Sequence, residues 1–174
     1  MKKLILIVTL LISTLTVKAQ TPFDKFENQD DVNTIIINKK MFELIAKTKS
    51  KDKEKTQLLN LVKKLDQIKV FSSESVSKGK EMKVIAESYI KNNKLEELMR
   101  SNNGGKNVKI YVKNGTSDSV IKELFMYIEG DASEKNTVLL LLIGNLDIDE
   151  ISELTETLNL PGKEEIKKAS KKNN

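Results

Sequence analysis

The sequence predicts an α+β fold, a two-layer sandwich in which helices pack on one face of a mostly antiparallel five-stranded sheet. Two observations carry this prediction. The first is the run 138–143, six apolar residues without a helical or alternating period that are bounded by polar residues and by Gly144. Such a short run is typical of a strand covered on both faces. The second is the order of the segments, in which strands alternate with helices before three strands follow one another closely.

The first half of the chain supplies two strands and three helices. Residues 32–38 are rich in β-branched side chains and alternate loosely, which favours a strand. The helices are indicated by apolar residues that recur at three- and four-residue spacing. In order, we expect an irregular lead-in at 21–31 with Phe23 and Phe26 on one side, a strand at 32–38, a helix at 39–47, a helix at 52–66, a strand at 67–73, and a helix from Ser75 or Ser77 with a short continuation through Leu95, Leu98 and Met99.

The second half predicts an antiparallel meander followed by one helix. Val108, Ile110 and Val112 alternate with polar neighbours, and two further strands follow at 120–129 and 138–143. The connections between the three strands are too short for parallel crossovers. The final helix follows, capped by Asp147 or Asp149.

Three regions differ in composition. Residues 1–19 have a basic start, an apolar run from Leu4 to Val17 and small residues at Val17 and Ala19, a pattern typical of a secretory signal peptide cut after Ala19. Residues 20–162 form one domain, which Pro161-Gly162 ends. Residues 163–174 are rich in Lys and Asn, and we expect a flexible tail there because few apolar side chains are present.

The charge and composition exclude several functions. The full chain of 174 residues carries +5, but the signal and the tail hold most of this excess, and residues 20–162 carry about −1. Arg100 is the only arginine, so nucleic-acid recognition has little support. The chain has no His and no Cys, which excludes Ser-His-Asp and Cys-His catalysis, thiol redox chemistry and ordinary structural zinc sites. No Cys follows the apolar run, so a lipoprotein is not expected.

The remaining polar patterns are common in ordinary folds. The acidic residues at 147–153 could hold Ca²⁺, but helix capping explains them better. Asn114-Gly115-Thr116 fits an N-glycosylation pattern and fits a hairpin turn better. Tyr111 and Tyr127 are placed for cross-strand packing, with a ligand platform as the weaker alternative. We therefore assign no catalytic, cofactor-binding or metal-binding residue, and we expect no cofactor.

Several stretches together resemble a known family, the domain-of-unknown-function family 4252 of small exported proteins of Bacteroidetes-type bacteria. The resemblance lies in the signal peptide and in three mature stretches, which are Ile35-Ile36-Ile37 with Met41-Phe42, Val108-Lys109-Ile110-Tyr111, and Leu141-Leu142-Ile143-Gly144-Asn145-Leu146 before the last helix. It covers about residues 32–158. The family implies no activity and no catalytic residues. Many similar proteins carry a lipid-attachment Cys, which this chain lacks, and this favours a soluble periplasmic or secreted location.

The sequence thus predicts an exported, non-enzymatic protein that acts as a binding or envelope-associated module with an unknown protein or envelope partner. No transmembrane helix is expected after signal cleavage, and the oligomeric state is left open. One alternative is a small-ligand or lipid carrier, which requires an apolar pocket of about 300–1,000 Å³. Another is a hydrolase that uses carboxylates or Lys, which requires such groups to converge in a cleft. A regulator of an envelope signalling partner is a third.

The signal segment generates the first prediction. When the chain is expressed with its own N-terminus, intact-mass analysis of the exported protein should show Gln20 as the first residue. Ala19→Tyr should slow or block the cleavage because the peptidase requires a small side chain there. Lys18→Tyr, between the two recognised positions, should be processed normally. Unprocessed wild-type protein would contradict the prediction.

Overall fold

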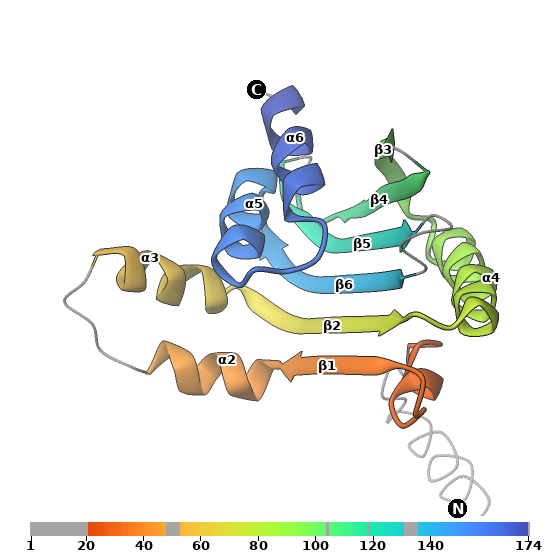
Figure 1. The fold of residues 1–174 in the computed structure, drawn as a ribbon. Helices are drawn as coiled ribbons and strands as arrows, with labels where there is room; N and C mark the ends of the chain where they lie inside the picture. The colour runs from red at the N-terminus through yellow and green to blue at the C-terminus, as the bar shows by residue number, and fades with distance from the viewer. Residues whose placement is uncertain (1–20, 48–52, 104, 118, 131–135, 174) are drawn as a thin grey trace, which may run out of the picture.

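A computed structural model describes residues 21–47, 53–103, 105–117, 119–130 and 136–173, and the expected signal segment lies outside these residues (Figure 1). The helices in the described part include none that is long and apolar enough to cross a membrane. The elements are the 3-10 helix η1 (Asp24–Phe26), β1 (Asn33–Asn38), α2 (Lys39–Ala46), α3 (Lys53–Val62), β2 (Leu65–Ser73), α4 (Val76–Asn93), β3 (Glu96–Asn103), β4 (Lys106–Asn114), β5 (Ile121–Glu129), β6 (Thr137–Leu146), α5 (Ile148–Thr157) and α6 (Lys163–Asn173).

The strands form one antiparallel sheet in the order β1-β2-β6-β5-β4-β3. The predicted meander of β4, β5 and β6 is confirmed, and β6 lies in the middle between β2 and β5 (Figure 1). Side chains of β6 alternate between two buried clusters. Val138, Leu140 and Leu142 enter one cluster, while Leu139 and Leu141 enter the other. This explains why the run 138–143 has no polar face.

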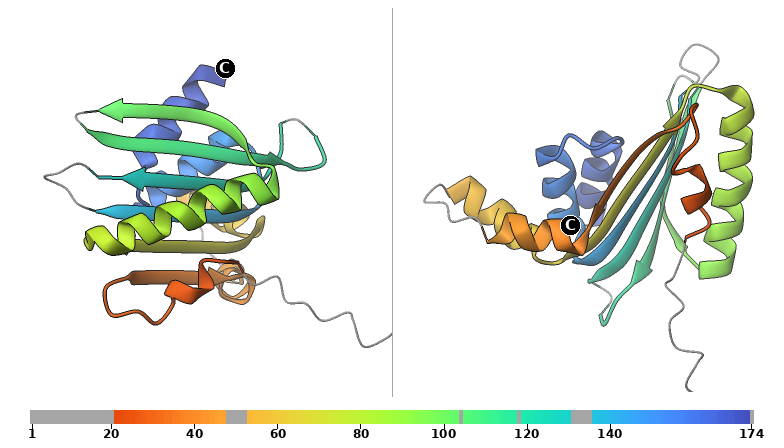
Figure 2. Two further views of the ribbon diagram at one scale, coloured as in Figure 1. Left: turned by 90° about the vertical axis from the view of Figure 1, so that its right-hand side faces the viewer. Right: turned by 90° about the horizontal axis from the view of Figure 1, so that it is seen from below.

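The α+β class is confirmed, but helices cover both faces of the sheet rather than one. η1 and α4 pack on one face, where Phe23, Phe26 and Met82 are fully buried. α2, α3, α5 and α6 lie on the other, where Ile151 and Ile166 are buried (Figure 2). The expected placement of all helices on one face was wrong, because α4 and α5 each have an apolar face and periodicity alone cannot show that these faces pack on opposite sides of the sheet.

The sheet in the described part has six strands, not five, because Glu96–Asn103 is a strand. The sequence predicted a helical continuation through Leu98 and Met99. Instead, α4 ends at Asn93, and Lys94 adopts a left-handed conformation (φ 53°) that closes the helix. The next residues pair with β4 along nearly their whole length. Tertiary pairing outweighs a composition that suits a helix.

The tail predicted to be flexible forms α6, which packs against α5 (Figure 1). Ile166 is 0% exposed and Ala169 is buried. The few apolar side chains of this segment are therefore sufficient to pack it against the rest of the protein. Gly162 allows the turn into this helix. Its φ of 76° is in the left-handed region, and a Cβ atom there would lie 2.2 Å from the sulfur of Met126. Pro161-Gly162 therefore joins two helices and does not end the domain.

The second prediction tests the packing of α6. Ile166→Ala should lower the free energy of unfolding by about 2–5 kcal/mol, because it removes a buried side chain from the core. Lys168→Ala, an exposed change in the same helix, should alter it by less than about 0.5 kcal/mol. Urea unfolding followed by circular dichroism measures both. Equal stability of the two variants would show that the segment does not contribute to the core.

Candidate functional site

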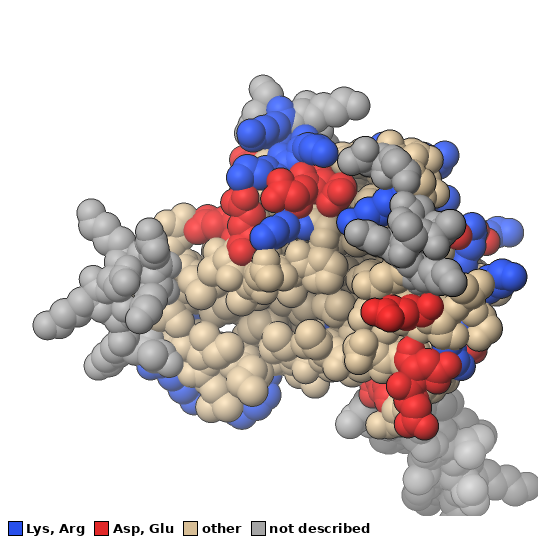
Figure 3. All heavy atoms as spheres, in the orientation of Figure 1, with Lys and Arg blue, Asp and Glu red and all other residues tan. Residues whose placement is uncertain are grey.

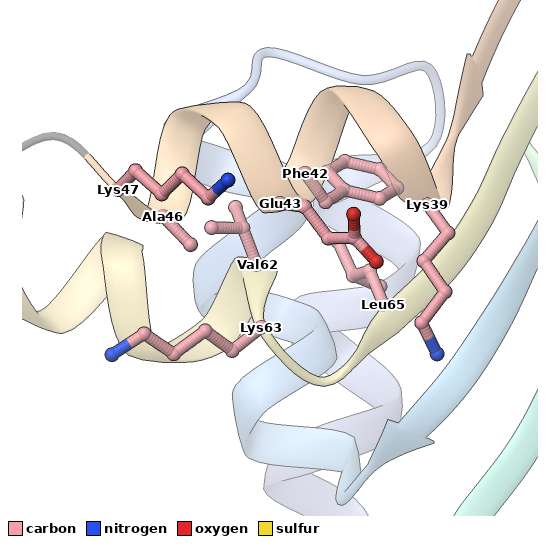
Figure 4. Close-up of a pocket in the computed structure, with 8 residues that line it drawn as sticks. All are labelled: Lys39, Phe42, Glu43, Ala46, Lys47, Val62, Lys63 and Leu65. Carbon is pink, nitrogen blue, oxygen red and sulfur yellow. The ribbon is translucent and has the colours of Figure 1, made fainter.

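An open pocket of about 310 Å³ lies between α2, α3 and the start of β2 (Figure 4). It is formed where two helices extend beyond the end of the sheet, each continuing from or leading into an adjacent strand (Figure 1). Its lining residues are Lys39, Phe42, Glu43, Ala46, Lys47, Val62, Lys63 and Leu65. We regard this pocket as the candidate functional site because it combines an apolar interior with several charged groups.

The interior of the pocket is apolar. Phe42, Val62 and Leu65 are buried members of the core cluster, and Ala46 packs against them. Figure 4 shows Ala46 and Val62 pointing toward each other across the gap between the helices. Hydrophobic walls with a few polar groups are the usual lining of a ligand pocket. The volume lies at the small end of the range that such pockets span.

The mouth of the pocket is positively charged. Three lysines and one glutamate leave an excess of two positive charges. Lys39 is held by Asp66 at 2.7 Å, and this hydrogen bond raises the pKa of Lys39 above its ordinary value. Among the described residues, Lys63 donates a hydrogen bond to the neutral amide oxygen of Asn60, at 3.3 Å. Lys47 forms no ion pair within the described part of the chain. Two cations are therefore available to an anionic group.

An exposed apolar stripe lies on the same helix. Met41 and Leu44 are 52% and 53% exposed, and Ile45 is 37% exposed. In α2, Phe42 is the buried residue, and these three side chains lie outside the core. Most other large apolar side chains of the described part are at least partly covered. None of these three side chains lines the pocket, so they form an exposed apolar surface on the outer side of α2.

A second polar cluster lies on the opposite face of the sheet. The ammonium group of Lys69 is buried and forms ion pairs with Asp24 and with Glu27, the latter at 3.3 Å. Burial raises the pKa of Asp24, but hydrogen bonds from Lys69 and Thr21 together with the charge of Lys69 outweigh it and hold that pKa below its ordinary value. These residues do not line the pocket between α2 and α3. The cluster fixes η1 to the sheet.

Two buried tyrosines, Tyr89 and Tyr127, lie on the same face as this cluster. Tyr89 donates a hydrogen bond to the buried carboxylate of Glu123 at 2.8 Å. Burial, followed by this contact with Glu123, raises the pKa of Tyr89. Burial and the nearby Glu129 and Glu87 raise the pKa of Tyr127 in the same way. Both phenols therefore stay neutral at physiological pH, where they can donate hydrogen bonds but cannot act as bases.

The acidic residues at 147–153 serve the helix, as expected. Asp147 accepts a hydrogen bond from the backbone N–H of Glu150 at 2.8 Å, and Glu150 accepts one in return from the N–H of Asp147, which forms a capping box. Glu150 also pairs with Lys64, and Glu153 accepts a hydrogen bond from Gln57. Within the described residues, no three acidic side chains converge in a group that could hold a metal ion.

The other two patterns are also structural. Asn114 is the last residue of β4 and Gly115 begins the connection to β5, where the N–H of Gly115 donates to the carbonyl of Val120 at 2.6 Å. The preferred interpretation as a hairpin turn is confirmed. Tyr111 and Tyr127 lie on the adjacent strands β4 and β5, but Tyr111 is paired with Phe125 and Tyr127 with Lys109. No contact between the two tyrosine rings is present in the described part.

A family model described as "Domain of unknown function (DUF4252)" matches residues 26–154, which are 129 of the 174 residues. The chain belongs to this family. The expected membership in the domain-of-unknown-function family 4252 is thus confirmed. No curated protein and no solved structure matches the chain. The matched segment of this DUF4252 protein contains the whole pocket between α2 and α3, whereas α6 lies outside it.

The buried ion pairs of Lys69 generate the third prediction. Lys69→Met should lower the free energy of unfolding by about 1–3 kcal/mol at pH 7, because Asp24 and Glu27 lose their cation. The pKa of Asp24 is depressed in the folded state, so its contribution is complete above the ordinary value of 3.8 and is lost as the pH falls through the folded pKa.

The difference between wild type and variant should therefore be largest at neutral pH and should shrink below about pH 4. Urea unfolding at pH 7 and pH 3 measures it. Lys113→Met, at an exposed position, serves as the control. A difference that stays constant over this pH range would show that Lys69 does not set the ionisation of Asp24.

Proposed function

We propose that this protein is an exported, non-catalytic binding module of the cell envelope, and that the pocket between α2 and α3 binds an anionic amphiphile. The ligand class is a hydrocarbon chain that ends in a carboxylate or a phosphate. The single observation that carries the proposal is the pocket itself, with its apolar interior and its excess of positive charge at the mouth. The signal segment predicted at residues 1–19 supports export.

The two parts of such a ligand match the two parts of the pocket. A hydrocarbon chain would displace water from Phe42, Val62 and Leu65, and the gain is proportional to the apolar area removed from water. The anionic end would remain near Lys47 and Lys63, whose ammonium groups have no carboxylate partner in the described part. Both contacts are needed, because an open pocket of this size covers only part of a ligand.

The arrangement of titratable groups supports binding more than catalysis. The pocket contains one carboxylate, Glu43, which lies 3.4 Å from the exposed Lys40. The hydrogen bond with Asp66 raises the pKa of Lys39, whereas a nucleophilic lysine requires a depressed pKa. The convergent group of Lys69 with two carboxylates lies on the other face of the sheet.

The fourth prediction concerns this ligand. Decanoate should bind the processed protein, and decanol, which lacks the charge, should bind at least about tenfold more weakly. Methyl NMR spectra should show shifts at Ala46 and Val62, which line the pocket. Lys47→Glu should raise the Kd for decanoate about tenfold, because it replaces an attractive charge with a repulsive one.

Lys113→Glu provides the matched control, since Lys113 is exposed on β4, outside the pocket lining. It introduces the same change in net charge and should leave the Kd unchanged. Equal weakening by both substitutions would indicate a general charge effect and would refute the pocket as the binding site. Absence of methyl shifts at millimolar decanoate would refute the proposed ligand class.

A further inference from the structure

The sheet has one edge that lacks the usual protection. β1 pairs with β2 on one side and has no strand on its other side in the described part (Figure 1). Its six residues, Asn33–Asn38, carry no charge, and its register with β2 has no bulge. The opposite edge strand, β3, carries Glu96, Glu97 and Arg100 and has a register irregularity. Charges and bulges are the features by which edge strands avoid pairing with other chains.

Opposite charges flank this uncharged strand. Asp30 and Asp31 precede it, and Lys39 and Lys40 follow it. Both aspartates are exposed and form no ion pair within the described residues, and the side chain of Lys40 is 76% exposed. Figure 3 shows the result along the lower edge of the molecule, where uncharged surface separates a basic end on the left from an acidic end on the right.

The charge pattern is complementary to itself in the antiparallel sense. In an antiparallel pair, the acidic residues Asp30 and Asp31 that precede β1 in one copy lie at the same end of the strand pair as Lys39 and Lys40, which follow β1 in the other copy. A parallel arrangement would place like charges together, which is unfavourable. The edge therefore fits one occupant best, and this occupant is a second copy of the same strand in the opposite direction.

We propose that β1 is the interface of a homodimer, in which two copies of the six-stranded sheet join into one continuous sheet across a two-fold axis. Antiparallel pairing gives each copy the same surface, as a two-fold dimer requires. It satisfies the free main-chain groups of β1 and covers Ile35, which is 55% exposed. Lys39 follows β1 and also lines the pocket, but the strand β1 that would pair lies outside the pocket lining.

Sedimentation velocity of the processed protein, over about 1 to 200 μM, tests the dimer, because a six-residue strand pair gives an interface of modest affinity. We expect the mass to rise from monomer to dimer within this range. Ile35→Lys should weaken the dimer at least about tenfold, because it places charges on both copies at the centre of the interface. Val84→Lys, at a 67% exposed position on α4, should have no effect. A monomer at every concentration would overturn the proposal.

Reversing the charges at the two ends of β1 tests whether this strand forms the dimer interface. Asp31→Lys and Lys40→Glu should each weaken the homodimer, because each places like charges opposite one another. A mixture of the two variants should form a heterodimer about as tight as wild type, and so should the chain that carries both substitutions. Circular dichroism confirms that each variant is folded. Failure of the mixture to dimerise, or dimers that both single substitutions leave unchanged, would refute pairing through β1.

Discussion

The structure depends on the burial of both faces of β6. Its apolar side chains alternate between the two core clusters, so a helical layer on only one face would leave half of them in water. Full burial of one Leu side chain contributes about 1.5–3 kcal/mol, and β6 places several on each face. This requirement explains why η1 and α4 cover one face while α5 and α6 cover the other. It also explains why β6 occupies the middle of the sheet, where its edges are paired as well.

The same requirement accounts for the buried charges beside β6. β2 pairs with β6, and Lys69 lies opposite Leu141 on the face that η1 covers. A buried ammonium group is costly unless carboxylates surround it. Asp24 and Glu27 meet this need, and they lie in the same short segment that supplies Phe23 and Phe26 to the core. The segment around η1 therefore supplies both the apolar side chains that cover this face of the sheet and the carboxylates that pair with Lys69.

The local sequence pattern was sufficient to predict most of the strands and helices, but it did not predict the pocket. The strands at 33–38, 65–73, 106–114 and 121–129 were predictable because their apolar residues alternate or cluster. β3 was not, because Glu96–Asn103 has no β-branched residues and depends on its pairing with β4. α6 was missed because its many lysines obscure Ile166 and Ala169. The pocket requires α2 and α3 to lie side by side, and no periodicity within either helix encodes that arrangement.

The pocket and the open edge of the sheet have the same cause, which is that both buried clusters are centred on β6. Both clusters are densest around β6 and thin out toward β1, so α2 contacts the core chiefly through Phe42, with Ala46 at its margin. Because α2 makes few contacts with the core, a space remains between α2 and α3, and the outer side of α2 stays exposed. Its lysines then have different surroundings, since Lys39 is tied to Asp66, Lys47 lies at the pocket and Lys40 flanks the free strand. The residues of α2 that contribute little to the core lie within the segment that the DUF4252 family model matches.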